Sequence, residues 1–495
     1  MSDNVVIAGF ALSRFLTLLT KIKENSVLLG LASLPWLIFR SGTKPSRIAY
    51  PCQRAAAANT WLMLSSLFLP FLATAQKRTS RFLYSKTLWA AAATVLIVGS
   101  GIAYWWEGQP EMPQKETQSL GLTLESKSAV AWPASDIFVV NGTTGQDNGV
   151  NELINLMGSN GLRFYQTQED GITYGPEGLI ARDDVVLIKV NCQWDERGGT
   201  NTDLLKALIQ AIVNHPEGFV GEIIVADNGQ GRGSLDWSDN NAEDESQSAQ
   251  DVVDAFSDSF SVSTFLWDAI RQNRVDEYYS GDLGDGYVVN ETADPETGIR
   301  TSYPKFQTVY GTYVSFMMGV WNPSTDSYQQ ERLKVINVPV LKTHSTYGVT
   351  ASVKHYMGVV SQPLTDAHST VGRGGMGTEM VQTRFPALNI LDAIWINPIP
   401  LNGPGTSYRE AMRVNVIIAC TDPIALDYWA AKHVLIQSAN LKGTGNTDTM
   451  DPDNSAEGSF GSWLELSMQE ISAAGYRVTK NEDQMNIHVT HLQSE

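Results

Sequence analysis

Short apolar runs of strand length alternate with amphipathic helical runs from residue 134 onward. Residues 185–190 and 222–226 are rich in aliphatic side chains, as expected for strands covered on both faces. Between them, residues 203–213 place apolar side chains at 204, 205, 208, 209, 212 and 213, along one face of a helix. Similar strand-like runs begin near residues 137, 335, 390 and 415. This alternation predicts an α/β domain over residues 134–495, with a mostly parallel sheet and helices on both faces.

The alternation is interrupted between residues 234 and 330. An acidic, polar stretch precedes a predicted helix near residues 250–274, and a tract rich in Gly, Tyr and Thr follows at 279–327. Alternating runs in that tract, such as YVVN and TVYGTYVSF, predict β-hairpins. We therefore expect an irregular, β-rich insertion on one side of the sheet. Such loops commonly set substrate choice, although this one could equally be a lid or a surface for a protein partner.

The first 107 residues have the apolar segments of a membrane region with transmembrane helices. Residues 87–106 are uncharged over twenty positions, which is long enough to span a bilayer, and residues 55–75 form a second such run. Shorter apolar runs precede them, so the number of spans stays open. The positive-inside rule places the basic loop at 77–86 in the cytoplasm, and the α/β domain is then expected on the extracytoplasmic side. Residues 108–133 are predicted to be a linker.

Charge is divided unevenly between the two ends of the chain. Residues 1–86 contain eleven Lys/Arg and two Asp/Glu, whereas the rest contains 24 Lys/Arg and 51 Asp/Glu. A basic apolar leader before an acidic body is typical of a membrane anchor with a soluble domain. The acidic body argues against nucleic acid as a partner, because binding phosphate backbones requires a basic face.

The cysteines and glycine-rich turns exclude several cofactor classes. Cys52, Cys192 and Cys420 are far apart, so the chain has no four-cysteine iron–sulfur motif, no c-type haem attachment motif and no disulfide framework. The turn NGQGRG at 228–233 departs from the dinucleotide-binding pattern and is interpreted as a loop. A Walker loop and a nucleophile elbow are also absent from the sequence. The cofactor therefore stays unknown.

Residues 335–358, VINVPVLKTHSTYGVTASVKHYMG, combine a strand, a polar turn and a short helix that ends at Gly358. Pro339 indicates a strand end or an edge position. Because side chains alternate along a strand, Lys342 and His344 are expected to point the same way. Ligands of open α/β sheets collect at the carboxyl ends of strands, where helix N-termini offer N–H groups to anions. This stretch is the best candidate for a site.

Polar side chains at the ends of parallel strands would share one edge of the sheet. We expect Lys189, Lys342 and His344 to share a pocket, with Lys354 as a fourth catalytic candidate. Lysine and histidine suit an anionic or carbonyl-bearing small molecule and general acid–base chemistry. The residues expected to bind substrate are Asn191, Asp227, Thr343 and Asp392. The structural alternative is that each residue is solvated or satisfies a nearby carbonyl, and Asp422 before Pro423 is explained as a helix N-cap.

A metal site is a further alternative at the same edge. Imidazole and carboxylate groups are common ligands of transition metals, and the candidates here are His344, His355, His368 and Asp392. The sequence has no HExxH motif to support them, so the metal content stays unknown.

Four motifs also resemble a known family. NVPVLKTHSTYGVTASVKHYMGVV at 337–360, DVVLIKVN at 184–191, NILDAIW at 389–395 and TDPIALDYWAAKHV at 421–434 are similar, in the same order, to the domain of unknown function 362 family. The resemblance spans about residues 134–438. It implies no particular activity, since the family is named for lacking one. Some relatives carry ferredoxin-type iron–sulfur modules, which would imply redox metabolism, but no such module is expected in this chain.

Two functional classes follow from these features. In the first, the protein is a membrane-tethered enzyme that binds and transforms a small anionic or carbonyl-bearing substrate. In the second, it is a binding or assembly subunit of a membrane or cell-surface complex, with a protein partner at the membrane region or at the insertion. The cluster of Lys and His favours the first class.

Overall fold

The structure is a computed structural model that describes residues 120–365 and 367–492. Its apolar runs form a central ten-stranded sheet with the strand order β18-β1-β17-β16-β13-β5-β6-β7, in which β14 also pairs with β16 and β15 pairs with β14. The strands are β1 (Ser135–Asn141), β5 (Val185–Lys189), β6 (Glu222–Asp227), β7 (Ser261–Leu266), β13 (Leu333–Asn337), β14 (Val340–His344), β15 (Gly348–Thr350), β16 (Leu388–Asn397), β17 (Met412–Cys420) and β18 (Met485–His491).

The prediction of a mostly parallel sheet is confirmed. Strands β7, β6, β5, β13 and β16 pair in parallel, and β1 pairs in parallel with β18. Strand β17 runs antiparallel to both of its neighbours, β16 and β1. As a result, β17 ends at the opposite edge of the sheet from β5 and β6, and Asp422 does not share their edge. Its side chain instead accepts hydrogen bonds from the backbone of Ile424 and Ala425, as the N-cap interpretation predicted.

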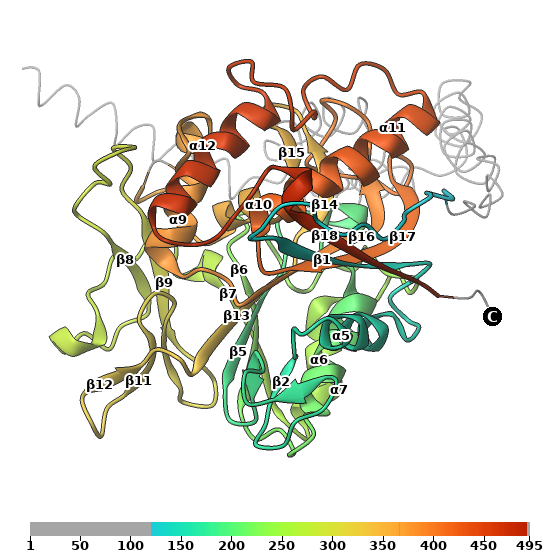
Figure 1. Ribbon diagram of the computed structural model, residues 1–495. Coiled ribbons are helices and arrows are strands. Elements are labelled where there is room, and N and C mark those ends of the chain that lie inside the picture. Colours follow the sequence, from blue (N-terminus) through green and yellow to red (C-terminus); the bar gives the residue numbers. More distant parts are fainter. Residues whose placement is uncertain (1–119, 366, 493–495) are drawn as a thin grey trace, which may run out of the picture. The chain divides into compact units, whose positions relative to one another are not determined.

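Helices cover both faces of the sheet (Figure 1) because successive strand side chains point to opposite sides. In β5, Val186 and Ile188 belong to one buried apolar cluster, whereas Val185 and Leu187 belong to the other. The first cluster contains side chains of α5 (Gly149–Ser159), α6 (Thr202–Val213) and α7 (Ala249–Ser257). The second contains those of α8 (Ser352–His355), α9 (Gly375–Thr383), α10 (Pro423–Ala430), α11 (Ile436–Lys442) and α12 (Phe460–Ala473).

The insertion begins later than its predicted start at residue 234. The predicted helix near 250–274 is wrong beyond Ser257, because residues 261–266 form β7 at the edge of the main sheet. The β-rich part is a separate antiparallel sheet, seen at the left of Figure 1. Its strands are β8 (Gly286–Val289), β9 (Ser302–Gln307), β10 (Tyr313–Ser315), β11 (Gly319–Asn322) and β12 (Ser327–Gln329). A small sheet of β2 (Tyr165–Gln166), β3 (Tyr174–Gly175) and β4 (Ile180–Ala181) lies elsewhere in the chain.

The central stretch differs from its predicted form. The run around Pro339 is broken into β13 and β14, and the predicted polar turn is instead the end of β14 and a hairpin into β15. Only Ser352–His355 are α-helical, and a short 3₁₀ turn, Tyr356–Gly358, follows. Lys342 and His344 are therefore strand residues, cross-strand partners of Thr350 and Gly348.

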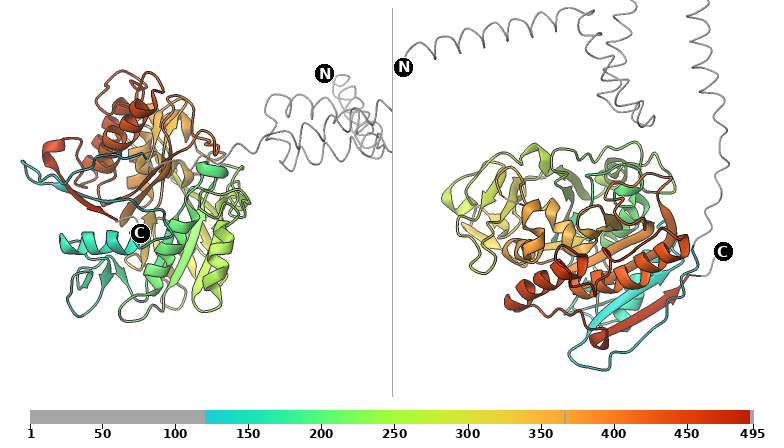
Figure 2. Two further views of the ribbon diagram at one scale, coloured as in Figure 1. Left: turned by 90° about the vertical axis from the view of Figure 1, so that its right-hand side faces the viewer. Right: turned by 90° about the horizontal axis from the view of Figure 1, so that it is seen from above.

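The predicted membrane region lies outside the described residues. Within the described ranges, no helix combines the length and the apolar composition needed to cross a bilayer. The described part of the predicted linker packs on the domain, since Leu122 and Leu124 are buried in one of the two apolar clusters. Figure 2 shows the described domain from two further directions, with the helices again on both sides of the sheet.

Candidate functional site

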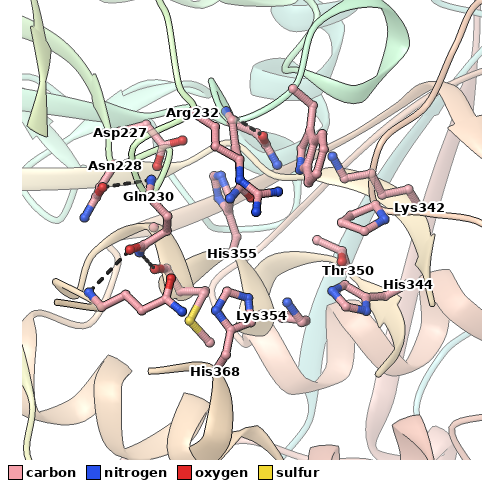
Figure 3. A pocket seen from close by; sticks show the side chains of 17 residues that line it. Asp227, Asn228, Gln230, Arg232, Lys342, His344, Thr350, Lys354, His355 and His368 are labelled. Carbon is pink, nitrogen blue, oxygen red and sulfur yellow. Dashed lines mark hydrogen bonds between the residues drawn. The ribbon is translucent and has the colours of Figure 1, made fainter. Parts of the chain in front are cut away.

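A cavity of about 350 Å³ lies at the carboxyl ends of β5, β6 and β14. This is the edge at which ligands collect in open α/β folds. Its lining is mostly polar, and the labelled side chains in Figure 3 point toward a common space. The polar and charged residues that line it include Asn191, Asp227, Asn228, Gln230, Arg232, Lys342, His344, Thr350, Lys354, His355 and His368.

Strand alternation brings two of the predicted catalytic residues to this cavity. Lys342 and His344 both line it, and Lys342 is completely buried, with its amine donating a hydrogen bond to the carbonyl of Gly198. Thr343 points the other way and donates from Oγ1 to the carbonyl oxygen of Ile399 at 2.8 Å. Thr343, predicted to bind substrate, is therefore absent from the described cavity lining, and its side chain holds the 399–403 loop.

Lys189 lies beneath the cavity and not in its lining. Its amine is 2.8 Å from Oδ1 of Asp227, and both side chains are buried. The second carboxylate oxygen of Asp227 accepts a 2.9 Å hydrogen bond from the backbone N–H of Cys192. Gly358 lies directly over this pair, and a Cβ there would come within 2.3 Å of Asp227 Oδ1. The close approach explains why glycine occupies position 358.

The short helix α8 carries Lys354 and His355 into the cavity lining. Its first N–H groups are already taken by Asp427 of α10, which accepts from Ser352 at 2.7 Å and from Val353 at 2.9 Å. The expectation that this helix N-terminus binds an anionic ligand is therefore wrong. Asp427 acts as a positioning residue for α8, and burial raises the pKa of its carboxyl to about 7.

The three histidines around the cavity have different environments. In His355, Nδ1 lies 2.7 Å from Oδ1 of Asn337 and Nε2 lies 3.0 Å from the carbonyl oxygen of Val190. In His344, Nδ1 accepts hydrogen bonds from the backbone of Thr346 and Tyr347, so Nε2 carries the proton of the neutral ring. Burial lowers the pKa of His344 to about 2 and that of His368 to about 4, with the Lys354 charge acting in the same direction.

The metal interpretation is not supported by this arrangement. Both ring nitrogens of His355 face protein oxygens, and Asp392 is absent from the cavity lining. Among residues 120–365 and 367–492, no group of three or more His, Cys, Asp or Glu side chains is placed to hold a metal ion. His344 and His368 remain as cavity-lining histidines.

Asp392, predicted to bind substrate, lies outside the described cavity lining and accepts hydrogen bonds from the backbone. It lies within β16, fully buried, and accepts a 2.9 Å hydrogen bond from the backbone of Asn201 at the start of α6. It also accepts from the N–H of Ile394 at 3.1 Å. Burial raises its pKa to about 7. Asn191, in contrast, does line the cavity, and its Oδ1 accepts from the backbone of Gln193 at 3.3 Å.

Sequence reasoning missed the contribution of the glycine-rich turn at 228–233. The N–H groups of Gly229 and Gly231 both donate to the carboxylate of Asp268. These two N–H groups are therefore already hydrogen-bonded, and the turn contributes the side chains of Gln230 and Arg232 to the cavity lining. Gln230 in turn donates to the carbonyl of Met357 at 2.7 Å, so it connects the turn to the α8 segment. The sequence signal for this contribution was the run of alternating glycines that directly follows a buried strand.

Thr350 was also missed, because the hairpin between β14 and β15 was not recognised. It faces Lys342 across the strand pair and lines the cavity. Its residue is 6% exposed, and its hydroxyl has no hydrogen-bond partner among the described residues. A buried hydroxyl without a partner is uncommon in folded proteins. Because Thr350 lines the cavity, its unpaired hydroxyl is a candidate to donate a hydrogen bond to a ligand there.

The cavity is electrostatically positive within an acidic protein. Lys342, Lys354 and Arg232 contribute cationic groups, whereas Asp227 is the single carboxylate among its described lining residues and is paired with Lys189. Burial and, to a smaller extent, the nearby charge of Lys354 lower the pKa of Lys342 to about 7. Burial also lowers the pKa of Lys354, to about 8. Arg232 is exposed at the rim.

Three comparisons place this geometry beside known proteins. A family model described as "Domain of unknown function (DUF362)" matches residues 330–432, which include Lys342, His344 and Lys354 but neither Lys189 nor Arg232. The thylakoid-associated protein sll1697 of Synechocystis sp. is 29% identical over 139 residues, which cover 25% of this chain and 42% of that protein. No solved structure matches this chain. The chain thus spans less than half the length of the curated relative that it matches.

Proposed function

We propose that the protein binds a small anionic molecule in the cavity at the ends of β5, β6 and β14. The observation that carries the proposal is the excess of cationic side chains in that lining. Burying a charge without a partner is costly, so Lys342 and Lys354 would gain most from an anion that enters the cavity. The volume of about 350 Å³ suits a small metabolite.

The distribution of groups gives the proposed ligand an orientation. Arg232 and Gln362 are exposed at the rim, whereas Lys354 and Thr350 are buried on the floor. An anionic group on the floor would accept hydrogen bonds from the Lys354 ammonium and from the unpaired Thr350 hydroxyl. Charge-assisted hydrogen bonds of this kind are stronger than neutral ones. A second polar group of the ligand would then lie near Arg232.

Proton transfer is the chemistry that these residues support best. A lysine with a pKa of about 7 is present in both protonation states at neutral pH, as required of a general base or acid. His344 adds a neutral ring whose Nε2–H can donate to developing negative charge. We assign proton transfer to Lys342 and charge stabilisation to Lys354 and His344.

Calorimetric titration of the full chain with a panel of small anions tests the proposal. The panel contains phosphate, acetate, pyruvate, lactate and succinate, each paired with an uncharged amide or alcohol of similar size. We expect at least one anion to bind at one site per chain, and the uncharged partner to bind far more weakly. Equal binding of the charged and uncharged partners, or no binding of any anion, would refute it.

We also propose that the protein works at a membrane, with residues 1–107 as the anchor and the α/β domain on the extracytoplasmic side. The uncharged run at 87–106 and the thylakoid-associated relative support this location. Protease treatment of intact cells should then digest the chain beyond residue 107. Protection equal to that of a cytoplasmic protein would count against the proposed side of the membrane.

A further inference from the structure

Four lysine side chains are buried in the described part of the chain, and they differ in what stabilises their charge. Lys189 forms an ion pair of 2.8 Å with Asp227. Lys305 lies over the ring of Tyr278 at 4.2 Å and has Asp282 Oδ1 at 3.8 Å. Lys354 lies over the ring of Tyr347 at 5.3 Å. Each of these three therefore has a carboxylate or an aromatic face that favours an ammonium ion.

Lys342 differs from the other three. Its amine donates a hydrogen bond to a neutral acceptor, the carbonyl of Gly198, and no carboxylate of a described residue lies within 4.0 Å of its nitrogen. An ammonium has three N–H donors and would leave donors unsatisfied in this place, whereas a neutral amine satisfies one donor and keeps a lone pair. Lys354 supplies a second positive charge to the same cavity, which adds repulsion against charging Lys342, whereas the carboxylates of Asp227 and Asp392, both beyond ion-pair distance, act in the opposite direction.

We propose, resting on the anion-binding function above, that Lys342 is a nucleophile that forms a Schiff base with the aldehyde or ketone group of an anionic ligand. The ligand class is then a small oxo acid or a phosphorylated carbonyl compound. Lysines that form Schiff bases are typically desolvated or placed next to another cation, and Lys342 meets both conditions.

The reaction balances without any oxidant or reductant. The Lys342 nitrogen bonds to the carbonyl carbon while the carbonyl π electrons move to oxygen, and a proton moves from nitrogen to that oxygen to give a carbinolamine. The C–O bond then breaks and one water leaves, so that amine and carbonyl become an imine and water. The leaving oxygen takes a proton from the Lys354 ammonium and departs as water, and the Lys354 amine then takes back the proton that the nitrogen of the resulting iminium loses, while Nε2–H of His344 can donate a hydrogen bond to the oxygen.

Thr350 and Lys354 fix which part of the ligand meets Lys342. Thr350 is the cross-strand partner of Lys342, so the two side chains lie on the same face of the strand pair, and both residues line the cavity. A carboxylate next to the carbonyl carbon would accept from this hydroxyl and from Lys354 while the carbonyl faces Lys342. The arrangement favours 2-oxo acids over carbonyl compounds in which the charge is distant.

Borohydride trapping followed by peptide mass spectrometry tests the inference. The full chain is incubated with pyruvate, glyoxylate, 2-oxoglutarate or glyceraldehyde 3-phosphate, and sodium borohydride then reduces any imine to a stable secondary amine. We expect at least one probe to modify Lys342 about tenfold more than Lys206, an exposed lysine of α6, since a desolvated amine is neutral more often. Lactate, which has no carbonyl, serves as the control and should give no adduct.

The variants separate this inference from the anion-binding proposal. Lys342→Arg removes the nucleophilic amine and should lose the adduct, whereas the control Lys206→Arg, at an exposed residue outside the cavity lining, should keep both the adduct and lactate binding. Lys342→Met reports whether the rest of the chain is modified at background level. If no probe modifies Lys342 above Lys206 while lactate binds to the wild type, the Schiff base is refuted and the anion site stands. If neither adduct nor anion binding occurs, both are refuted.

Discussion

Replacing Lys189 by Met is expected to lower the free energy of unfolding by about 3–5 kcal/mol, the typical cost of breaking a buried ion pair. The substitution leaves the Asp227 carboxylate without its 2.8 Å partner in a place where its side chain is only 3% exposed. The floor of the cavity would lose its order as well, because Gly358 and the N–H of Cys192 are held against this pair. Chemical denaturation of the full chain measures the effect.

A matched control comes from an ion pair near the surface. Lys432 lies 2.8 Å from Asp453 and 2.8 Å from Glu482, but all three side chains are partly exposed. We expect Lys432→Met to cost only about 0–1 kcal/mol, since exposed pairs contribute little. The double variant Lys189→Met, Asp227→Asn should recover part of the loss, because it removes the unpaired charge and keeps an acceptor for Cys192. An equal, small effect of Lys189→Met and Lys432→Met would contradict the structural role given to Lys189.

The second large effect is expected at Lys354. Lys354→Met should weaken binding of the best anion by at least about tenfold, since truncating one partner of a buried charge pair costs roughly 2–5 kcal/mol. Thermal stability should fall as well, because Lys354 lies near the buried Glu379 carboxylate and its positive charge favours the ionised form of that group. Calorimetry at two ionic strengths provides the measurement.

Lys206→Met is the control for that result. It removes one lysine charge from an exposed position of α6 that does not line the cavity. Each variant removes one lysine, so the net charge of the chain changes equally in both. The direct contact with the anion is lost only in Lys354→Met. If the two variants weaken anion binding to the same extent, the effect is a general one of net charge, and Lys354 is not a ligand-binding residue.

The sequence predicted the parts of this structure that depend on periodicity. Apolar runs of strand length located six strands of the main sheet, and alternation correctly put Lys342 and His344 on one side of β14. The same alternation places the Thr343 side chain on the opposite side of β14, as the structure shows. The prediction that Thr343 binds the same substrate did not follow from this alternation. Parallel pairing of β5 and β6 brings Lys189 next to Asp227.

The parts that failed depend on contacts between distant segments. Asp392 was predicted to lie at a strand end, but β16 continues for five residues beyond it. Its carboxylate accepts a hydrogen bond from the N–H of Asn201, at the start of α6. Asp427 lies 75 and 74 positions from Ser352 and Val353, whose N–H groups it caps, so no local pattern could pair them. Arg232 belongs to the glycine-rich turn, and this turn is held by Asp268, which accepts hydrogen bonds from the N–H groups of Gly229 and Gly231. Such pairings are set by tertiary packing and not by local sequence.

A crystal structure of the full chain with its tightest-binding anion tests the central claim most directly. The account predicts that the anion occupies the cavity at the ends of β5, β6 and β14, within hydrogen-bond distance of Lys354 and of the Thr350 hydroxyl, which has no other partner among the described residues. A second cavity, of about 650 Å³, is bordered by Leu122, Trp429 and His433. An anion found in that cavity or on the surface, with the Lys342 cavity empty at saturating concentration, would contradict it.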